Sequence, residues 1–240
     1  MNLTKDKIEK ISHIVIQVLY TRFITFPNDS LSNRNAPFHE AFLRAFSDRL
    51  NEKVVDIPFF ISLNSWLHGL NTSIGQTFFE NVAHILSDGE KREYTSKKSG
   101  NLKLTSDQKA NINEIMTDLS NSTKIPSLIE EDEILLKSDD SIKVNAIDFS
   151  ADVFIEDVDE IIAIELKSVK PNSGEMRGEK HKILEGKTAL SQKFPNHKIN
   201  FYIGFPFDPT DEDPCGSDKT RFMNSIINCN KYFHKDEVLL

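Results

Sequence analysis

Two acidic residues, Asp152 and Glu165, flank two apolar runs of the chain, and carboxylates in such surroundings are suited to binding a cation. The runs, 153–155 and 161–164, are separated by an acidic turn, which is the pattern of two buried strands joined in a hairpin. A tight turn makes the numbers of paired residues sum to about 316 or 317, so Asp152 falls opposite Ile164 or Glu165. The spacing therefore predicts that the two carboxylates meet.

Lys167 completes this group of charged side chains. Side chains alternate between the two faces of a strand, so Glu165 and Lys167 share one face and Leu166 points to the other. Ionisable groups on a largely apolar sheet are costly unless they are paired or bound to a cation. We therefore expect a divalent cation here, and the oxygen ligands favour magnesium. A purely structural ion pair is the alternative interpretation.

The acid-x-lysine spacing alone is a weak signal, because it also occurs at Asp107–Lys109 and Glu185–Lys187. Both of these stretches lie in polar, helix-like surroundings, where we expect exposed charges with no special role. The apolar runs on either side distinguish the hairpin from them.

The chain has 240 residues with 38% hydrophobic content, enough for a full core, and is most simply one compact domain. We expect an N-terminal helical region over residues 1–70, packed on a core over residues 71–240. No run is long enough to span a membrane and the N-terminus is unlike a secretion signal, so we expect a cytoplasmic protein. Cys215 and Cys229 lack zinc-site spacing and are expected to be reduced thiols.

The net charge of −8 argues against a protein that coats nucleic acid without regard to sequence, but the charge is segregated along the chain. Residues 130–160 are strongly acidic, whereas residues 167–198 are rich in lysine. Such a basic band next to the hairpin indicates phosphate binding. The alternative is a set of solvated surface lysines.

Three helices are expected near the N-terminus. The period of about 3.6 residues predicts the first from Thr4 to about Phe23. Pro37 suits the first turn of a second helix, whose apolar stripe extends from Phe38 to Leu50. A third, almost uniformly apolar helix is expected over residues 57–70 and is predicted to end at Gly69. We interpret all three as scaffold.

A further helix, over residues 73–86, carries Glu80 as its only carboxylate. We expect Glu80 to orient the lysine or a metal ligand of the hairpin site; a plain surface glutamate is the alternative. The basic segment after this helix includes Lys97 and Lys98 and is expected to line a DNA groove.

The segments after the hairpin complete an α/β pattern. Residues 171–178 contain a proline and two glycines and are expected to form a loop, followed by a helix over residues 179–194. Residues 199–205 read as another buried strand. The predicted order is strand, strand, helix, strand.

This order, with AD…ELK inside it and a helix carrying Glu80 before it, resembles the PD-(D/E)xK nuclease superfamily. Asp152 matches the first metal-binding acid, Glu165 the second and Lys167 the final lysine, while Ala151 stands where a proline often precedes the first acid. GQTFFENVAHIL and ELKSVKPNSGEMRGEKHKIL resemble type II restriction endonucleases, more specifically the TdeIII-like family. The resemblance covers residues 73–205 and implies a restriction-endonuclease-like mixed β-sheet core flanked by helices, with an N-terminal helical region.

The resemblance also implies an activity. It implies a Mg²⁺-dependent endonuclease that cuts double-stranded DNA at a GGNCC-like palindrome, acts as a homodimer and is accompanied by a DNA methyltransferase. Asp152, Glu165 and the backbone carbonyl of Leu166 would hold the metal, and Lys167 would orient or help deprotonate the attacking water. The alternatives are a repair or junction-resolving nuclease with the same core and an inactive DNA-binding module. Residues 236–240 look like the apolar beginning of an unfinished element, which points to a chain shortened at its C-terminal end, with impaired activity.

The stretch directly after Lys167 is expected to contact DNA. Arg177 is suited to two parallel hydrogen bonds with guanine, and Glu175 to accepting one from cytosine. The lysines of this stretch are expected to contact phosphates: Lys170, Lys180 and Lys182. A solvated loop is the alternative.

Overall fold

The structure is a computed structural model that describes residues 3–28, 41, 44–50, 53, 56–88, 90–91, 102–137, 140–169, 171–210 and 218–240. The chain divides into two compact units, Met1–Leu86 and Ser87–Leu240. The boundary that the sequence suggested at residue 70 falls inside a helix, α4 (Ile57–Thr72). Each unit is described separately below.

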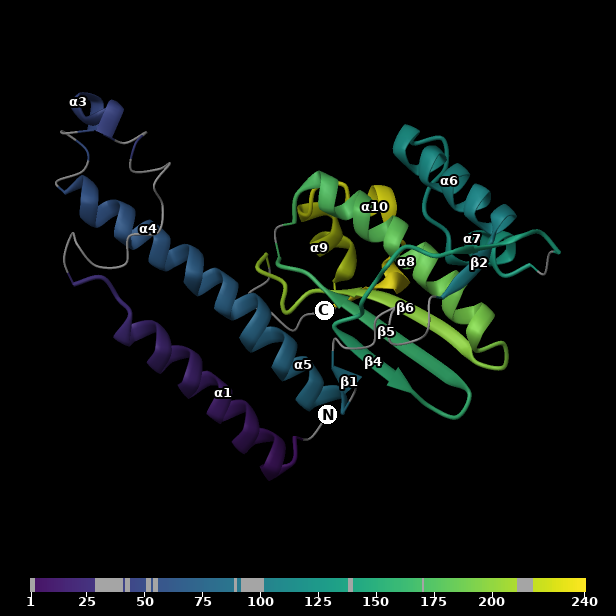
Figure 1. Cartoon of the computed structure of the whole chain (residues 1–240), viewed down its shortest axis with the longest axis horizontal. Helices are drawn as coiled ribbons and strands as arrows, with labels where there is room; N and C mark the ends of the chain where they lie inside the picture. The colour runs from purple at the N-terminus through teal and green to yellow at the C-terminus, as the bar shows by residue number, and fades with distance from the viewer. Residues whose placement is uncertain are drawn as a thin grey trace. The chain divides into compact units, whose positions relative to one another are not determined.

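The first unit is helical where the structure describes it (Figure 1). Helix α1 (Lys5–Ile24) begins after Thr4, whose side chain accepts a 3.3 Å hydrogen bond from the Lys7 amide, as the N-cap pattern predicted. After the short α3 (Ser47–Leu50), α4 continues directly into the π-helix η1 (Ser73–Phe79) and α5 (Glu80–Ser87). Residues 57–87 therefore form one uninterrupted helical stretch.

The predicted helix end at Gly69 is wrong, because this glycine serves packing instead of termination. A Cβ atom at Gly69 would lie 2.7 Å from Nη1 of Arg22. Arg22 Nε also donates a 2.8 Å hydrogen bond to Ser73 Oγ, and Trp66 Nε1 donates one of 2.8 Å to the Arg22 carbonyl. The absent side chain lets the guanidinium of α1 lie against α4.

The second unit is built on a mixed five-stranded sheet of order β1-β4-β5-β6-β7. Strand β4 is antiparallel to β1 and β5, whereas β6 is parallel to β5 and β7. The strands are β1 (Glu90–Lys91), β4 (Val153–Glu156), β5 (Glu160–Leu166), β6 (Lys198–Gly204) and β7 (Val238–Leu239). This is the mixed α/β core that the sequence predicted.

Helix α8 (Ser173–Lys193) connects the parallel pair β5 and β6 and packs against β6 and α6 (Ser106–Asn121) (Figure 1). Close packing on the sheet requires Gly186, where a Cβ would lie 2.7 Å from Phe201. The unit also holds a small sheet of β2 (Lys103–Thr105) and β3 (Lys143–Asn145). The remaining helices are α7 (Leu128–Leu135), α9 (Lys219–Ser225), α10 (Cys229–Tyr232) and η2 (Lys235–Glu237).

The β4–β5 hairpin has the predicted register. Val153 pairs with Ile164 and Phe154 with Ala163, a sum of 317 for each pair. In the turn, the Asp157 amide donates a 2.9 Å hydrogen bond to the Glu160 carbonyl, and Asp157 Oδ1 accepts one of 2.8 Å from the Val158 amide. Local turn chemistry and the apolar alternation thus fix the pairing.

The predicted loop over residues 171–178 is wrong, because α8 begins at Ser173. Asn172 caps the helix by accepting from the Glu175 amide (3.0 Å), and Glu175 in return accepts from the Asn172 amide (2.6 Å). This reciprocal cap satisfies two amides at the helix start and opposes the cost of two helical glycines, about 1 kcal/mol each relative to alanine.

The apolar residues near the end of the sequence belong to the sheet. Val238 and Leu239 form β7, and Val238 is fully buried beside Ile203 of β6. Cys229 is buried with a free thiol, whereas Cys215 lies outside the described residues. Among the described helices, none is long and apolar enough to cross a membrane.

Candidate active site

Asp152 and Glu165 meet at the open end of the hairpin, as their spacing predicted. Extending the β4–β5 register by one pair sets Asp152 opposite Glu165. The Leu166 amide donates a 2.8 Å hydrogen bond to Asp152 Oδ2. Both side chains are nearly inaccessible, with 4% of Asp152 and 7% of Glu165 exposed. Two buried carboxylates therefore lie side by side on the face of the sheet that also carries Ala163.

Lys167 lies on the same face, as the alternation along β5 predicted, and belongs to a closed ring of four charged side chains. Its Nζ lies 2.9 Å from Glu165 Oε1 and 2.9 Å from Glu179 Oε1. Lys182 Nζ lies 2.7 Å from Glu165 Oε1 and 2.9 Å from Glu179 Oε2. The charge ring, defined as Glu165, Lys167, Glu179 and Lys182, thus alternates in sign and joins β5 to α8.

Sequence reasoning missed Glu179 and misplaced Lys182. The signal that would have found them is the cap formed by Asn172 and Glu175, because a helix that starts at Ser173 places Glu175, Glu179 and Lys182 on one face at spacings of three and four. Gly186 continues that face and contacts the sheet. The face therefore points toward β5 and β6.

The electrostatics of the site raise the pKa values of both Glu165 and Lys167. Burial, followed by the charge of Asp152, raises the pKa of Glu165, while Lys182 and Lys167 oppose this rise. For Lys167 burial favours the neutral amine, but the ion pairs with Glu165 and Glu179 prevail and raise its pKa above the ordinary value. The ionised form of Glu165 is thus less favoured than it would be in water, whereas the protonated form of Lys167 is more favoured.

The residues present fit a magnesium ion with few protein ligands. Asp152 and the charge ring bring three carboxylates together with two ammonium groups. In the described part of the chain, no group of three or more His, Cys, Asp or Glu side chains is arranged to hold a metal. Magnesium commonly binds through one or two carboxylates, with water and phosphate oxygens completing its shell. Asp152 and Glu165 supply that number.

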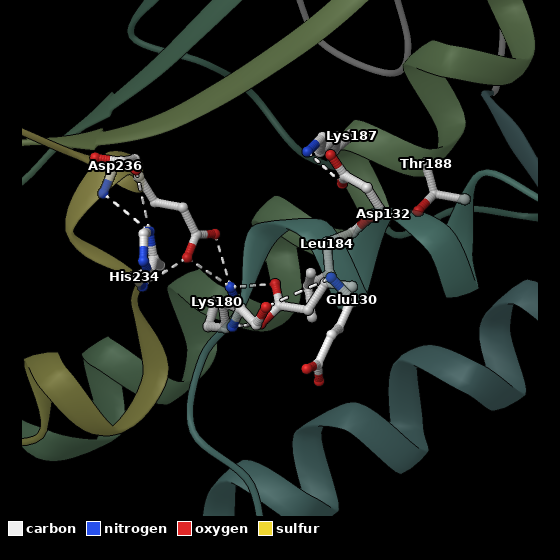
Figure 2. Close-up of polar contacts among 11 residues, drawn as sticks. Glu130, Asp132, Lys180, Leu184, Lys187, Thr188, His234 and Asp236 are labelled. Carbon is white, nitrogen blue, oxygen red and sulfur yellow. Dashed lines mark hydrogen bonds and ion pairs between the residues drawn. The ribbon is translucent and has the colours of Figure 1, made fainter.

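Lys180 was predicted to contact phosphate, and this prediction is wrong. Its side chain is fully buried, with Nζ 2.7 Å from Glu131 Oε2 and 2.6 Å from Glu237 Oε1. Figure 2 shows the Lys180 ammonium at the centre of these contacts. A lysine between two buried carboxylates is a structural counter-ion, because no part of it reaches solvent.

The other predicted DNA contacts are distributed around α8. Glu175 uses its carboxylate to cap the helix, and Lys182 points into the charge ring. Arg177 is exposed, but with 3.6 residues per turn it lies about 200° around the helix from Glu179. It lines an open hollow with residues of α6 such as Thr117. The structure therefore does not bring Arg177 to the carboxylates.

Lys97, Lys98 and Lys170 lie outside the described residues. Glu80 is the first residue of α5 in the first unit, so its role beside the hairpin stays a prediction. Glu185, expected to be exposed, is instead fully buried and accepts a 2.7 Å hydrogen bond from the Ile147 amide.

Comparisons with known proteins agree with this chemistry. A family model described as "Type II restriction endonuclease, HinfI" matches residues 3–238. The type II restriction enzyme MjaII of Methanocaldococcus jannaschii is 47% identical over 246 residues, which cover all of this chain and 65% of that relative. No solved structure gives a significant match. The TdeIII-like assignment is not confirmed by these comparisons.

Proposed function

Because the chain belongs to the HinfI family of type II restriction endonucleases, we propose that it cleaves double-stranded DNA at a specific sequence, with magnesium held by Asp152 and Glu165. The observation that carries this proposal is that two buried carboxylates meet an ammonium group at the end of one hairpin. The Leu166 backbone carbonyl, at the end of β5, is proposed as a third ligand.

The roles of the side chains follow from their surroundings. A bound magnesium ion would supply positive charge beside the scissile phosphate and favour ionisation of water. Asp152 is held in place for binding by its hydrogen bond from the Leu166 amide. Lys167, whose ammonium lies 2.9 Å from two carboxylates, donates hydrogen bonds and is suited to orienting a water molecule or a phosphate oxygen.

We also propose how the protein assembles, which enzyme accompanies it and where it acts. A palindromic site is read by two-fold protein symmetry, so we propose a homodimer acting on a GGNCC-like sequence. A DNA methyltransferase with the same specificity would protect the host genome, and the protein would act in the cytoplasm. The motif resemblance to the TdeIII-like family supports the GGNCC-like site.

The test is a digest of plasmid and phage DNA by the purified protein in MgCl₂, with EDTA as the control. We expect a discrete set of fragments, and sequencing their ends reports the site and the stagger together. Sedimentation of the protein on a cognate duplex in CaCl₂ reports the number of protomers bound.

Two results would redirect the proposal. Cutting only at branched or damaged DNA would identify a repair or junction-resolving nuclease with the same core. Binding to duplex DNA without any cutting in magnesium would identify an inactive DNA-binding module.

A further inference from the structure

The charge ring contains two side chains, Glu179 and Lys182, to which the proposed cleavage assigns no role. Both lie on α8, and both are largely buried, with 15% and 19% of their side chains exposed. Lys182 Nζ approaches Glu165 at the same oxygen, Oε1, that Lys167 contacts. One carboxylate oxygen of the proposed metal ligand is therefore shared by two ammonium groups.

Lys182 and a metal ion bound to Glu165 would therefore compete for the same carboxylate oxygen. A cation that binds Glu165 approaches an oxygen that Lys182 contacts at 2.7 Å, and the two positive charges repel each other in partly buried surroundings. Lys167 is fixed in sequence two residues from Glu165 on the same strand face, so it remains beside the ligand. Lys182 lies on α8, and it can move away from Glu165 while it stays paired with a second carboxylate.

Glu179 provides that alternative. Its Oε2 lies 2.9 Å from Lys182 Nζ, at a spacing of three residues along α8, while its Oε1 lies 2.9 Å from Lys167 Nζ. When Lys182 leaves Glu165, its charge keeps a carboxylate partner and no buried ammonium is left unpaired. Helix α8 therefore supplies both Lys182, the counter-ion of Glu165, and Glu179, the carboxylate with which Lys182 stays paired.

We propose that Lys182 is the resident counter-ion of Glu165 in the metal-free protein, that it is exchanged for the divalent cation, and that Glu179 is the positioning residue that holds Lys182 and Lys167 during this exchange. The inference rests on the proposed metal site at Asp152 and Glu165. It differs from a purely structural ring, which would join α8 to β5 and would have no specific effect on metal affinity.

The exchange predicts opposite effects for the two side chains. Lys182→Met removes the competing charge and retains the aliphatic stem, so metal affinity should rise about tenfold. Glu179→Gln removes the alternative partner, so both ammonium groups depend more on Glu165 and metal affinity should fall several-fold. Lys182→Arg and Glu179→Asp keep the charges and should stay close to wild type.

The measurement is titration with MnCl₂, read from the electron paramagnetic resonance signal of free Mn²⁺, on the whole protein without DNA. Manganese prefers the same oxygen ligands as magnesium, and this signal reports binding independently of cleavage. The matched control is Lys187→Met, because Lys187 is a partly buried lysine of the same helix that is paired with Asp132. Its metal affinity should equal that of wild type. Lys182→Gln replaces Lys182→Met if the latter is poorly folded.

The outcomes separate the two proposals. Tighter Mn²⁺ binding by Lys182→Met together with weaker binding by Glu179→Gln supports the exchange. If wild type binds Mn²⁺ and cuts DNA but Lys182→Met and Lys182→Gln bind no more tightly, the exchange is overturned and the metal site stands. If wild type neither binds Mn²⁺ nor cuts DNA, the metal site itself is wrong and the exchange is overturned with it.

Discussion

Asp152 Oδ2 accepts a 2.8 Å hydrogen bond from the backbone amide of Leu166, the residue between Glu165 and Lys167. The first acid is therefore oriented by the backbone of the strand that carries the other two charged groups. This bond explains how a carboxylate with 4% exposure keeps a fixed position beside a second one.

Because Asp152 accepts this hydrogen bond, a substitution can remove its negative charge without removing its structural contact. Asp152→Asn keeps an oxygen acceptor for the Leu166 amide but removes the negative charge, so folding should be retained. Cleavage should fall by at least about 100-fold, because an electrostatic contact to the reacting centre is lost. Plasmid cleavage rates and the melting temperature report the two effects. Near-normal cutting by Asp152→Asn would remove Asp152 from the metal site.

Magnesium should stabilise the protein in the absence of DNA. A ligand at about 100 times its Kd adds about 2.7 kcal/mol to the free energy of unfolding, which raises the melting temperature by several degrees. Asp152→Asn should abolish this rise. Asp159→Asn, a change at an exposed acid of the hairpin turn, should leave it intact. Equal rises in both variants would show that the stabilisation is non-specific.

Lys180 should contribute far more to stability than a surface lysine. Lys180→Met leaves Glu131 and Glu237 facing each other without a counter-ion and should cost about 3–5 kcal/mol of unfolding free energy. Lys124→Met, which removes a 53% exposed side chain paired with Asp118, should change stability little. Urea denaturation of the two variants checks this. Similar midpoints would contradict a structural role for the buried ammonium.

Glu131 should make stability depend on pH. Burial raises the pKa of Glu131 above its ordinary value of 4.5, Lys180 opposes the rise and Glu237 adds to it. The folded state therefore binds this proton more tightly than the unfolded state, so the associated stability is present below pH 4.5 and is lost as pH rises through the folded pKa. Relative to wild type, Glu131→Gln should gain stability over that range, by at most about 1.4 kcal/mol per pH unit. Denaturation curves from pH 4 upward measure the difference, and parallel pH profiles would show that Glu131 does not titrate there.

Arg177 is exposed, so Arg177→Ala should leave the fold intact and affect only DNA recognition. We expect a loss of about 1–3 kcal/mol of discrimination at a G·C pair, measured as affinity for the cognate duplex and for duplexes with one changed base pair. Unchanged discrimination would place base reading on another segment, such as the one that contains Lys97 and Lys98.

The hairpin could be predicted from sequence because its determinants are local. The apolar alternation in β4 and β5 and an acidic turn fix the register that brings Asp152 to Glu165. Lys182 was misplaced because one of its two partners, Glu165, lies on another element, and lysine spacing alone suggests a solvated surface. The burial of Lys180 was missed for the same reason, since its counter-ion Glu237 is 57 residues away in the chain.

The separation of Lys180 from Glu237 by 57 residues also affects folding during synthesis. A ribosome completes α8 and β6 well before it adds Glu237 and Val238, so the growing chain holds Lys180 with one of its two carboxylates and β6 without its outer neighbour. The second unit can therefore reach its final packing only late in synthesis, after residues 237–239 have left the ribosome.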